Sequence, residues 1–312
     1  MTALGMDVGG STLKVVALDD DDVIVHSSRV AVPEIAVSDF VVGAARRAVA
    51  EHAATTLGLG VAGLVKFPAG EFVWGPHLDG TSIPYRSMLA AELGFDVAVD
   101  NDANLAAYAE WAIGAGERKD PLVMITLGTG IGAGFVLDGR VYRGASFAGE
   151  AGHIEVAADG EVCSCGRNGC WETFVSGAKL DRLAVEIART DPGGGVAAHA
   201  GTITPTGIHL AKAAAEGDSS AVAAIHVAGR WLGRGLVNLV LLFDPVRIVI
   251  GGAAGTAGPA LLDPARAVLA ETMPGASYRL PVPVCPARFG SLSGAVGAAL
   301  AGRRVHNGHH DW

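Results

Sequence analysis

Three cysteines and one histidine are grouped in the middle of the chain in a pattern suited to metal binding. Cys163, Cys165 and Cys170 lie within eight residues, and His153 precedes the first of them by ten. The chain has one other cysteine, Cys285. Three thiolates and one imidazole complete the tetrahedral shell of a structural zinc ion and leave no ligand position open for chemistry. We therefore predict a structural Zn²⁺ held by these four side chains.

Two carboxylates flank this cluster. Glu150 lies three residues before His153, and Glu172 lies two residues after Cys170. A bound ion would hold both carboxylates and the imidazole near one point. The zinc is therefore expected to shape a polar pocket and not to carry out the reaction itself.

Glycine turns follow three predicted strands, at residues 9–12, 128–130 and 251–252. Glycine lets backbone N–H groups approach an anion closely, and a ring of such donors binds phosphate. Each turn alone is also ordinary hairpin geometry. Together they favour a nucleotide, because the first is flanked by Asp7 and Lys14 and two of them contain hydroxyl side chains. Neither a Walker sequence nor a dinucleotide fingerprint is present.

Asn101 and Asp102 follow another predicted strand and precede an alanine-rich helix. Either residue is a preferred helix N-cap. Alternatively, Asp102 is a general base that takes a proton from a hydroxyl as it attacks phosphorus. The spacing leaves both readings open, and one residue for each task also fits.

The elements that position these residues repeat along the chain. Strand, glycine turn and strand occur at residues 3–18 with a third strand at 23–25, and the same unit recurs at 122–137. The other predicted elements are helices at 36–55, after residue 102 and from 293, and strands at 57–62, 97–99 and 247–250. This repetition predicts an internal duplication: an N-terminal domain at 1–115 and a larger domain at 116–312. In one alternative the last helix packs back on the N-terminal domain.

Composition limits the function classes. The chain has 312 residues, with 23 basic and 32 acidic side chains and a net charge of −9, which argues against nucleic-acid binding. No run of eighteen apolar residues is free of charge, so no membrane segment is expected. No signal peptide is evident, and the predicted location is cytoplasmic. The histidine-rich end, residues 303–312, is expected to be a frayed terminus.

Several of these motifs occur in the order typical of the ROK family (repressors, open reading frames and kinases). They are Asp7-x-Gly-Gly-Ser-Thr-x-Lys14, Asp100-Asn-Asp102-x-Asn104, Leu127-Gly-Thr-Gly-Ile-Gly132, Gly149-Glu-x-Gly-His153, Cys163-x-Cys-Gly-x-x-Gly-Cys170-x-Glu172 and Ile250-Gly-Gly252. The histidine and cysteine cluster is the most specific of these matches, and the glycine turns support it. The chain resembles this family over nearly its whole length.

The resemblance implies an actin/hexokinase-like (ribonuclease H-like) duplicated α/β fold, two domains with a central cleft. It also implies an ATP- and Mg²⁺-dependent transfer of the γ-phosphoryl group to a sugar hydroxyl. Asp102 would be the catalytic base, and the sugar ligands would be Gly63, Asn101, Asp102, Glu150, His153 and Glu172. The nucleotide and its magnesium would contact Asp7, Gly9, Gly10, Ser11, Thr12, Lys14, Gly128, Thr129, Gly130, Gly251 and Gly252. By analogy a homo-oligomer, dimer or tetramer, is expected.

One segment departs from the family pattern. Many bacterial glucokinases of the family carry Pro-Asn-Leu followed closely by Trp, whereas residues 75–81 here read Gly-Pro-His-Leu-Asp-Gly-Thr. His77 and Asp79 add charge, which would suit an amino sugar such as kanosamine or a seven-carbon cyclitol. The alternative is a solvated loop with glucose as the acceptor.

Two further alternatives concern activity. A sugar-responsive repressor is disfavoured, because Asp7 leaves no room for a preceding helix-turn-helix domain and the chain is acidic. A polyphosphate donor is disfavoured because such enzymes of the family tend to lack the cysteine cluster. The predicted function is therefore a glucokinase-like sugar kinase.

Overall fold

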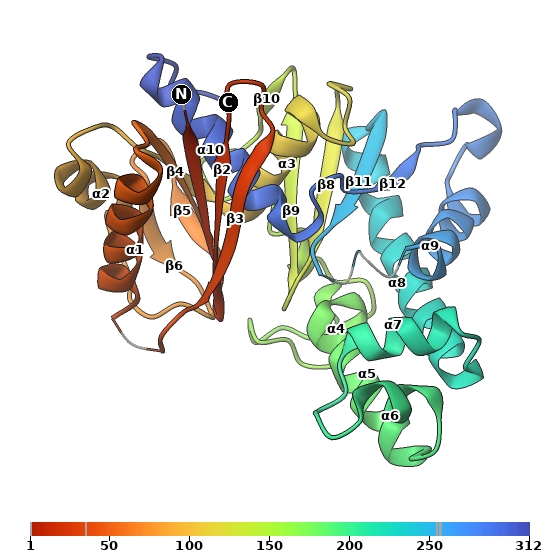
Figure 1. The fold of residues 1–312 in the computed structure, drawn as a ribbon. Coiled ribbons are helices and arrows are strands. Elements are labelled where there is room, and N and C mark those ends of the chain that lie inside the picture. Colours follow the sequence, from red (N-terminus) through yellow and green to blue (C-terminus); the bar gives the residue numbers. More distant parts are fainter. Residues whose placement is uncertain (1, 35, 254, 256–257) are drawn as a thin grey trace. The chain divides into compact units, whose positions relative to one another are not determined.

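The computed structural model describes residues 2–34, 36–253, 255 and 258–312, which form two compact units (Figure 1). The first unit contains Met1–Met124, Ala133–Gly149 and Ser291–Trp312. The second unit contains Ile125–Gly132 and Glu150–Gly290. The domain boundary predicted near residue 115 stays a prediction.

The first unit is built on a five-stranded sheet in the order β3-β2-β1-β4-β7. Its strands are β1 (Ala3–Val8), β2 (Thr12–Leu18), β3 (Ile24–Ala31), β4 (Thr56–Val61) and β7 (Ala98–Asn101). The first three form the predicted antiparallel meander, whereas β1, β4 and β7 run parallel. The parallel strands therefore end at one edge of the sheet.

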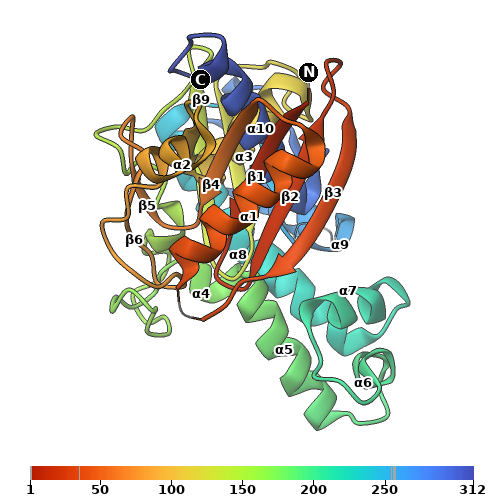
Figure 2. The same cartoon turned by 60° about the vertical axis from the view of Figure 1, so that its left-hand side comes forward.

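One helix packs on each face of this sheet. Successive side chains of a strand point to opposite faces, so β1 contributes residues to both contacts. Leu4 and Met6 of β1 share a core with Val41 of α1 (Val37–His52), which lies in front of the sheet in Figure 2. Gly5 faces the other way, and a Cβ there would lie 1.8 Å from the carbonyl oxygen of Ala295 in α10 (Ser293–His306). Because Gly5 has no side chain, α10 can approach the sheet closely at this position.

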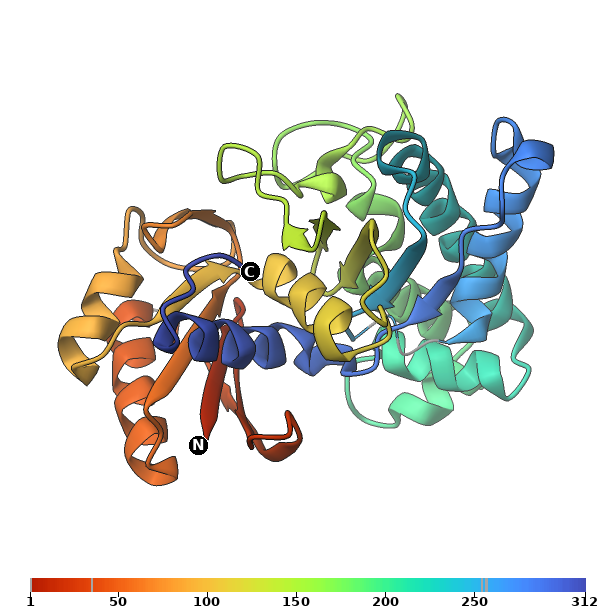
Figure 3. The same cartoon turned by 90° about the horizontal axis from the view of Figure 1, so that it is seen from above.

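Glycines on α10 allow an equally close approach to α3 (Asp102–Ile113), which lies beside it in Figure 3. A Cβ at Gly297 would lie 1.8 Å from the carbonyl oxygen of Leu105. This contact fixes α10 against the helix that begins with Asp102. The remaining elements of this unit are β5 (Leu64–Lys66), β6 (Glu71–Trp74), α2 (Tyr85–Leu93) and β10 (Arg140–Val141).

A second five-stranded sheet has the order β10-β9-β8-β11-β12. Its other strands are β8 (Leu122–Leu127), β9 (Ile131–Leu137), β11 (Arg247–Gly251) and β12 (Val284–Pro286). Each sheet is built from five strands that are arranged in the same way. The first three strands along the chain lie side by side in reverse order, and the fourth and fifth lie on the other side of the first. The duplication predicted from the repeated strand–turn–strand unit is therefore confirmed.

The helices of the second unit follow a short irregular segment. They are α4 (Glu172–Val175), α5 (Gly177–Thr190), α6 (Gly195–Ala200), α7 (Gly207–Ala215), α8 (Ser219–Phe243) and α9 (Pro259–Thr272). Trp171 is fully buried, and its indole N–H donates to the carbonyl oxygen of Trp231 at 2.9 Å. A Cβ at Gly235 would lie 2.0 Å from the Trp171 ring. Trp171 thus anchors the cysteine segment on α8.

None of the described helices combines the length and the apolar run needed to cross a bilayer.

Candidate active site

In the first unit, strand register gathers the predicted base and the first glycine turn. Val8 pairs with Val61, and Val61 pairs with Asn101, so the ends of β1, β4 and β7 form one row. Residues just beyond the carboxyl ends of parallel strands share one edge of the sheet, where α/β proteins bind ligands. Gly9, Gly63 and Asp102 follow these strand ends.

Asn101, and not Asp102, caps α3. Its side-chain oxygen accepts hydrogen bonds from the backbone N–H groups of Ala103 at 2.9 Å and Asn104 at 3.1 Å. Its amide nitrogen donates to the Gly63 carbonyl at 3.0 Å and to Asp102 Oδ1 at 3.1 Å. The cap satisfies orphan donors of the helix, which relieves Asp102 of that task. The cap is therefore Asn101, and the role of Asp102 as a general base stays a prediction.

These four hydrogen bonds use both lone pairs and both N–H groups of the Asn101 amide. A sugar hydroxyl that bound Asn101 would have to replace one of them. The predicted sugar contact of Asn101 stays a prediction, whereas its role in holding Gly63 and Asp102 is a feature of the structure.

The first glycine turn is tight and is flanked by a partly buried ion pair. The backbone N–H of Gly9 donates to the Thr12 carbonyl at 3.0 Å. Asp7 is 4% exposed, and its Oδ2 lies 2.7 Å from Lys14 Nζ. Gly294, in the first turn of α10, lies between this carboxylate and the helix that begins with Asp102. A Cβ there would lie 3.0 Å from Asp7 Oδ2 and 3.4 Å from the Asp102 carbonyl oxygen.

The second unit brings the other two glycine turns together. Gly128 donates to the Gly130 carbonyl at 3.0 Å, and its own carbonyl accepts from Gly177 at 2.7 Å. A Cβ at Gly252 would lie 2.5 Å from the carbonyl oxygen of Leu127, so the 251–252 turn lies against the 128–130 turn. No described atom lies within 4 Å of a Cβ built on Gly128. This turn therefore presents an open backbone surface.

The predicted metal ligands form one cluster in the second unit. The ligand atoms of His153, Cys163, Cys165 and Cys170 all lie within 4.8 Å of one another. Cys165 Sγ is 3.6 Å from Cys170 Sγ, and Cys163 Sγ is 3.6 Å from His153 Nδ1. Two sulfurs bound to one zinc ion at 2.3 Å are about 3.8 Å apart. The donor set and its spacing fit a tetrahedral Zn²⁺ site.

The two flanking carboxylates lie beside this cluster, as predicted. Glu172 Oε1 accepts from Cys163 Sγ at 3.0 Å and is 3.8 Å from His153 Nδ1. Glu172 Oε2 accepts from the backbone N–H of Ile131 at 3.3 Å. Glu150 Oε2 is 3.9 Å from His153 Nε2. Nδ1 of His153 thus faces the thiols, whereas Nε2 faces Glu150 and is available to a ligand.

Desolvation and a backbone hydrogen bond shift the pKa values of the thiols and of Glu150 in different directions. Desolvation raises the pKa of Cys170 to about 12 and raises that of Cys163 above its usual range. The backbone N–H of Arg167 instead lowers the pKa of Cys165. Desolvation also raises the pKa of Glu150, which the neighbouring imidazole partly offsets. Two of the three thiols therefore keep their protons at neutral pH unless a cation replaces them.

Residues 3–304 match the model of the ROK family. The chain belongs to the ROK family. It is 34% identical over 303 residues to the glucokinase of Streptomyces coelicolor, covering 95% of this chain and 96% of that protein. It is also 32% identical over 216 residues to a xylose repressor of Caldicellulosiruptor bescii, covering 68% of this chain and 54% of the repressor. The family thus includes both enzymes and regulators.

A solved structure agrees with the enzyme relatives. The ROK family glucokinase of Streptomyces griseus, determined in complex with glucose and AMPPNP, has a TM-score of 0.90 with this chain at 34% identity. The match covers 97% of this chain and 100% of that one. The predicted actin/hexokinase-like fold is confirmed, and the glucokinase relatives support a sugar kinase.

The interactions of Asp100, near the predicted base, were not predicted from the sequence. Asp100, immediately before Asn101, is fully buried and pairs with Arg143, and it also accepts a hydrogen bond from Trp312. A carboxylate inside a strand was the available signal, because buried charges require partners. Its partners could not be identified, since they are 43 and 212 residues away in the sequence.

Proposed function

We propose that the protein is an ATP- and magnesium-dependent kinase that transfers the γ-phosphoryl group to the primary (6-) hydroxyl of glucose or a close analogue. The observation that supports this most directly is the division of tasks at the start of α3. Asn101 caps the helix and also donates to Asp102 Oδ1, so the Asp102 carboxylate is oriented without being needed as the cap. In the proposed reaction Asp102 accepts the hydroxyl proton as the oxygen attacks phosphorus.

The glycine turns supply the phosphate contacts in this proposal. Backbone N–H groups of residues 9–12 and 128–130 other than those of Gly9 and Gly128, which donate within their own turns, would neutralise the developing charge. Asp7 would help to hold Mg²⁺, and Lys14, already 2.7 Å from Asp7, would balance the local charge. Gly251 and Gly252 would lie along the adenosine.

The metal cluster supplies the sugar contacts. Zn²⁺ held by the three thiolates and His153 would fix the loop, and Glu150, Glu172 and the free Nε2 of His153 would bind sugar hydroxyls. Carboxylates suit this task because each accepts two hydroxyl hydrogens. Gly63 would approach the sugar through its backbone.

A panel of acceptors assayed with ATP and Mg²⁺ tests the proposal. The panel contains glucose, mannose, N-acetylated and free amino sugars, and cyclitols, and turnover of each is measured by ADP release. Glucose or a neutral analogue should be the best acceptor, with the phosphate on the 6-oxygen by NMR. Absence of turnover on every acceptor would contradict the proposal.

An amino sugar such as kanosamine, or a seven-carbon cyclitol, is the second candidate acceptor. His77 and Asp79 are exposed, and a Cβ at Gly10 would lie 2.6 Å from His77 Cβ. Gly75, from the same segment, packs against Gly63. The departing segment therefore borders both the first phosphate turn and the proposed sugar contact. Faster turnover of a free amino sugar than of glucose would favour this candidate.

Three other expectations are tested alongside. A polyphosphate donor is distinguished from ATP in the same coupled assay. A gel-shift assay at physiological salt should show no DNA binding, because we propose a cytoplasmic enzyme and not a regulator. Light scattering should give a dimer or a tetramer.

A further inference from the structure

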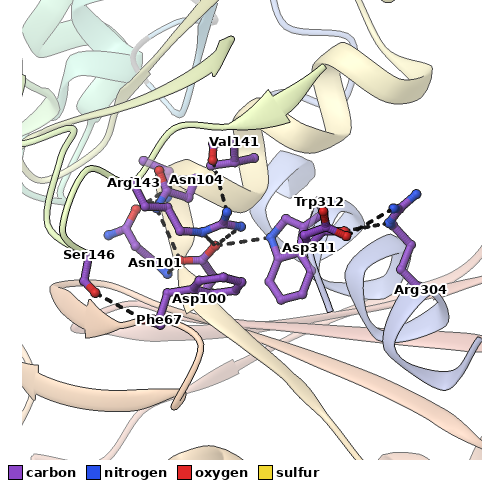
Figure 4. Close-up of polar contacts among 11 residues, drawn as sticks. Phe67, Asp100, Asn101, Asn104, Val141, Arg143, Ser146, Arg304, Asp311 and Trp312 are labelled. Carbon is purple, nitrogen blue, oxygen red and sulfur yellow. Dashed lines mark hydrogen bonds and ion pairs between the residues drawn. The ribbon is translucent and has the colours of Figure 1, made fainter. Parts of the chain in front are cut away.

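The segment that follows α10 does not fray as the sequence predicts. Trp312 lies beside Asp100 and Arg143 (Figure 4). It is only 4% exposed. The Trp312 carbonyl accepts from the backbone N–H of Val141 at 2.8 Å. Arg304 Nε donates to the Asp311 carbonyl at 2.9 Å. This prediction was wrong because an apolar ring and several backbone hydrogen bonds offset the entropy of ordering the segment.

Trp312 reaches a carboxylate that is completely buried. Asp100 Oδ2 accepts from Trp312 Nε1 at 3.2 Å and from Arg143 Nε at 2.9 Å. Asp100 Oδ1 accepts from the backbone N–H of Asn101 at 2.8 Å and from Asn104 Nδ2 at 3.2 Å. One carboxylate thus ties Trp312 and Arg143 to the strand end and first helical turn that carry the proposed base (Figure 4).

Two aromatic rings lie beside the Arg143 guanidinium. The Arg143 guanidinium carbon lies 3.8 Å from the centre of the Phe67 ring and 5.0 Å from that of Trp312. Arg143 Nη1 donates to the Val141 carbonyl at 3.1 Å, and Nη2 lies 2.8 Å from Asp100 Oδ2. The two rings also contact each other edge to face, with their centres 5.1 Å apart. The guanidinium is therefore held by a pair of aromatic rings and by the acceptors along its edge.

Such a group is an inefficient source of stability. Desolvating two charges costs several kcal/mol per ion, and apolar replacements of buried ion pairs are often equally stable. The group instead fixes the direction of the Asp100 carboxylate, which binds the backbone N–H of the next residue, Asn101. Asp100 Oδ1 holds the Asn101 backbone, and Asn101 Nδ2 holds Asp102 Oδ1.

We propose that Asp100, Arg143 and Trp312 form a positioning group that sets the orientation of the Asp102 carboxylate through Asn101. This inference rests on the proposed function, in which Asp102 is the base. In this proposal the three residues act through Asn101 and not on the sugar or the nucleotide themselves. A small displacement of a base relative to its hydroxyl lowers the rate of the chemical step while binding is kept.

Trp312→Phe tests the proposal, because it keeps an aromatic ring beside Arg143 and removes the N–H donor to Asp100, together with part of the indole ring. With glucose, ATP and Mg²⁺, kcat should fall about tenfold while both KM values change by less than about twofold. The matched control is Trp111→Phe, in the same unit. The Trp111 indole N–H has no hydrogen-bond partner within the described part of the chain, so this variant should keep the parent kcat.

A double-mutant cycle separates positioning from general stability. In an Asp102→Asn background, Trp312→Phe should lower the residual kcat by less than about twofold, because the group it positions is gone. An equal loss in both backgrounds, or a loss that follows the folded fraction by circular dichroism, overturns the proposal.

Arg143→Lys is a second variant that keeps the charge but loses the stacked, two-point contact with Asp100. It should also lower kcat with little change in KM, and its effect should combine less than additively with Trp312→Phe. If Asp102→Asn alone retains full activity, the proposed function fails. If Asp102→Asn is inactive and Trp312→Phe equals the parent protein, only the positioning proposal fails.

Discussion

The two sets of candidate catalytic side chains are held in place by different means. Asp102 begins a helix that is capped by Asn101 and packed against α10, and it follows a strand inside a five-stranded sheet. Glu150 and His153 lie on an irregular segment with a single 3₁₀ turn, Ala151–His153, and isolated β-bridges. Cys165, at its tip, is exposed.

This difference shows what a structural metal contributes. Regular backbone fixes Asp102 through ladder hydrogen bonds and close glycine contacts, which need no cofactor. The segment from Glu150 to Glu172 has backbone hydrogen bonds in turns and isolated bridges, such as that from the Val156 N–H to the Gly169 carbonyl at 2.9 Å, but it lies outside the strand ladders. Four ligands to one ion would therefore add the constraint that a ladder supplies for Asp102. Each side should therefore respond to a different perturbation.

The largest expected effect is on the base. Asp102→Asn should lower kcat by about three orders of magnitude, because general-base catalysis contributes 10²–10⁴-fold. The melting temperature and sugar affinity should stay close to those of the parent protein. Coupled-assay kinetics and isothermal titration calorimetry measure both quantities, with the exposed Asp39→Asn as the control. If Asp102→Asn retained its activity, Asp102 would not be the base. The comparison between the Asp102 region and the metal segment would then fail.

The second effect is on the metal segment. Removing zinc with a chelator, or replacing Cys165 by Ser, should weaken sugar binding by about 10–100-fold and increase proteolysis between residues 150 and 172. Calorimetry with glucose and mass spectrometry of the fragments measure these changes. Cys285→Ser is the matched control, since its thiol lies outside the cluster and donates to Ile248 at 3.6 Å. Unchanged sugar affinity in protein verified to be metal-free would mean that the loop holds its own shape.

Strand, turn and metal motifs could be predicted from the sequence because each depends on local spacing. Short apolar runs that end in glycine turns predicted β1 and β8, and four ligands within eighteen residues predicted the cluster. The sequence could not decide between Asn101 and Asp102 as the cap, because both side chains suit it. That choice depends on the Gly63 carbonyl, 38 residues away, which accepts from the Asn101 amide.

The ordered end of the chain was missed for a related reason. A short run rich in histidine and ending in Asp-Trp has no periodicity, so local reasoning favours disorder. Its order depends on Val141 and Asp100, which bind the backbone and the indole of Trp312 and are both distant in sequence. Positions of this kind need tertiary information, whereas the zinc ligands needed only their spacing.

A smaller effect concerns proton competition at the cluster. Burial raises the pKa of Cys163 and Cys170 in the metal-free protein, and zinc binding must displace their protons. Zinc occupancy should therefore fall as the pH is lowered from about 8 to about 5, and sugar affinity should fall with it. Measuring bound zinc and glucose affinity at each pH tests this. Glucose affinity that stays constant while bound zinc falls would contradict this coupling.

The smallest effects compare two glycines of one turn. A methyl at Gly128 meets open space, so Gly128→Ala should leave folding unchanged and raise the KM for ATP about fivefold, a loss of about 1 kcal/mol, by obstructing phosphate at the backbone. A methyl at Gly130 would meet Glu172 Oε2, a flexible carboxylate that must then move. Gly130→Ala should therefore raise the KM for the sugar more than that for ATP. Steady-state kinetics on the pair measure both constants. Identical changes in the two variants would mean that the 128–130 turn does not separate phosphate recognition from the metal-held carboxylates.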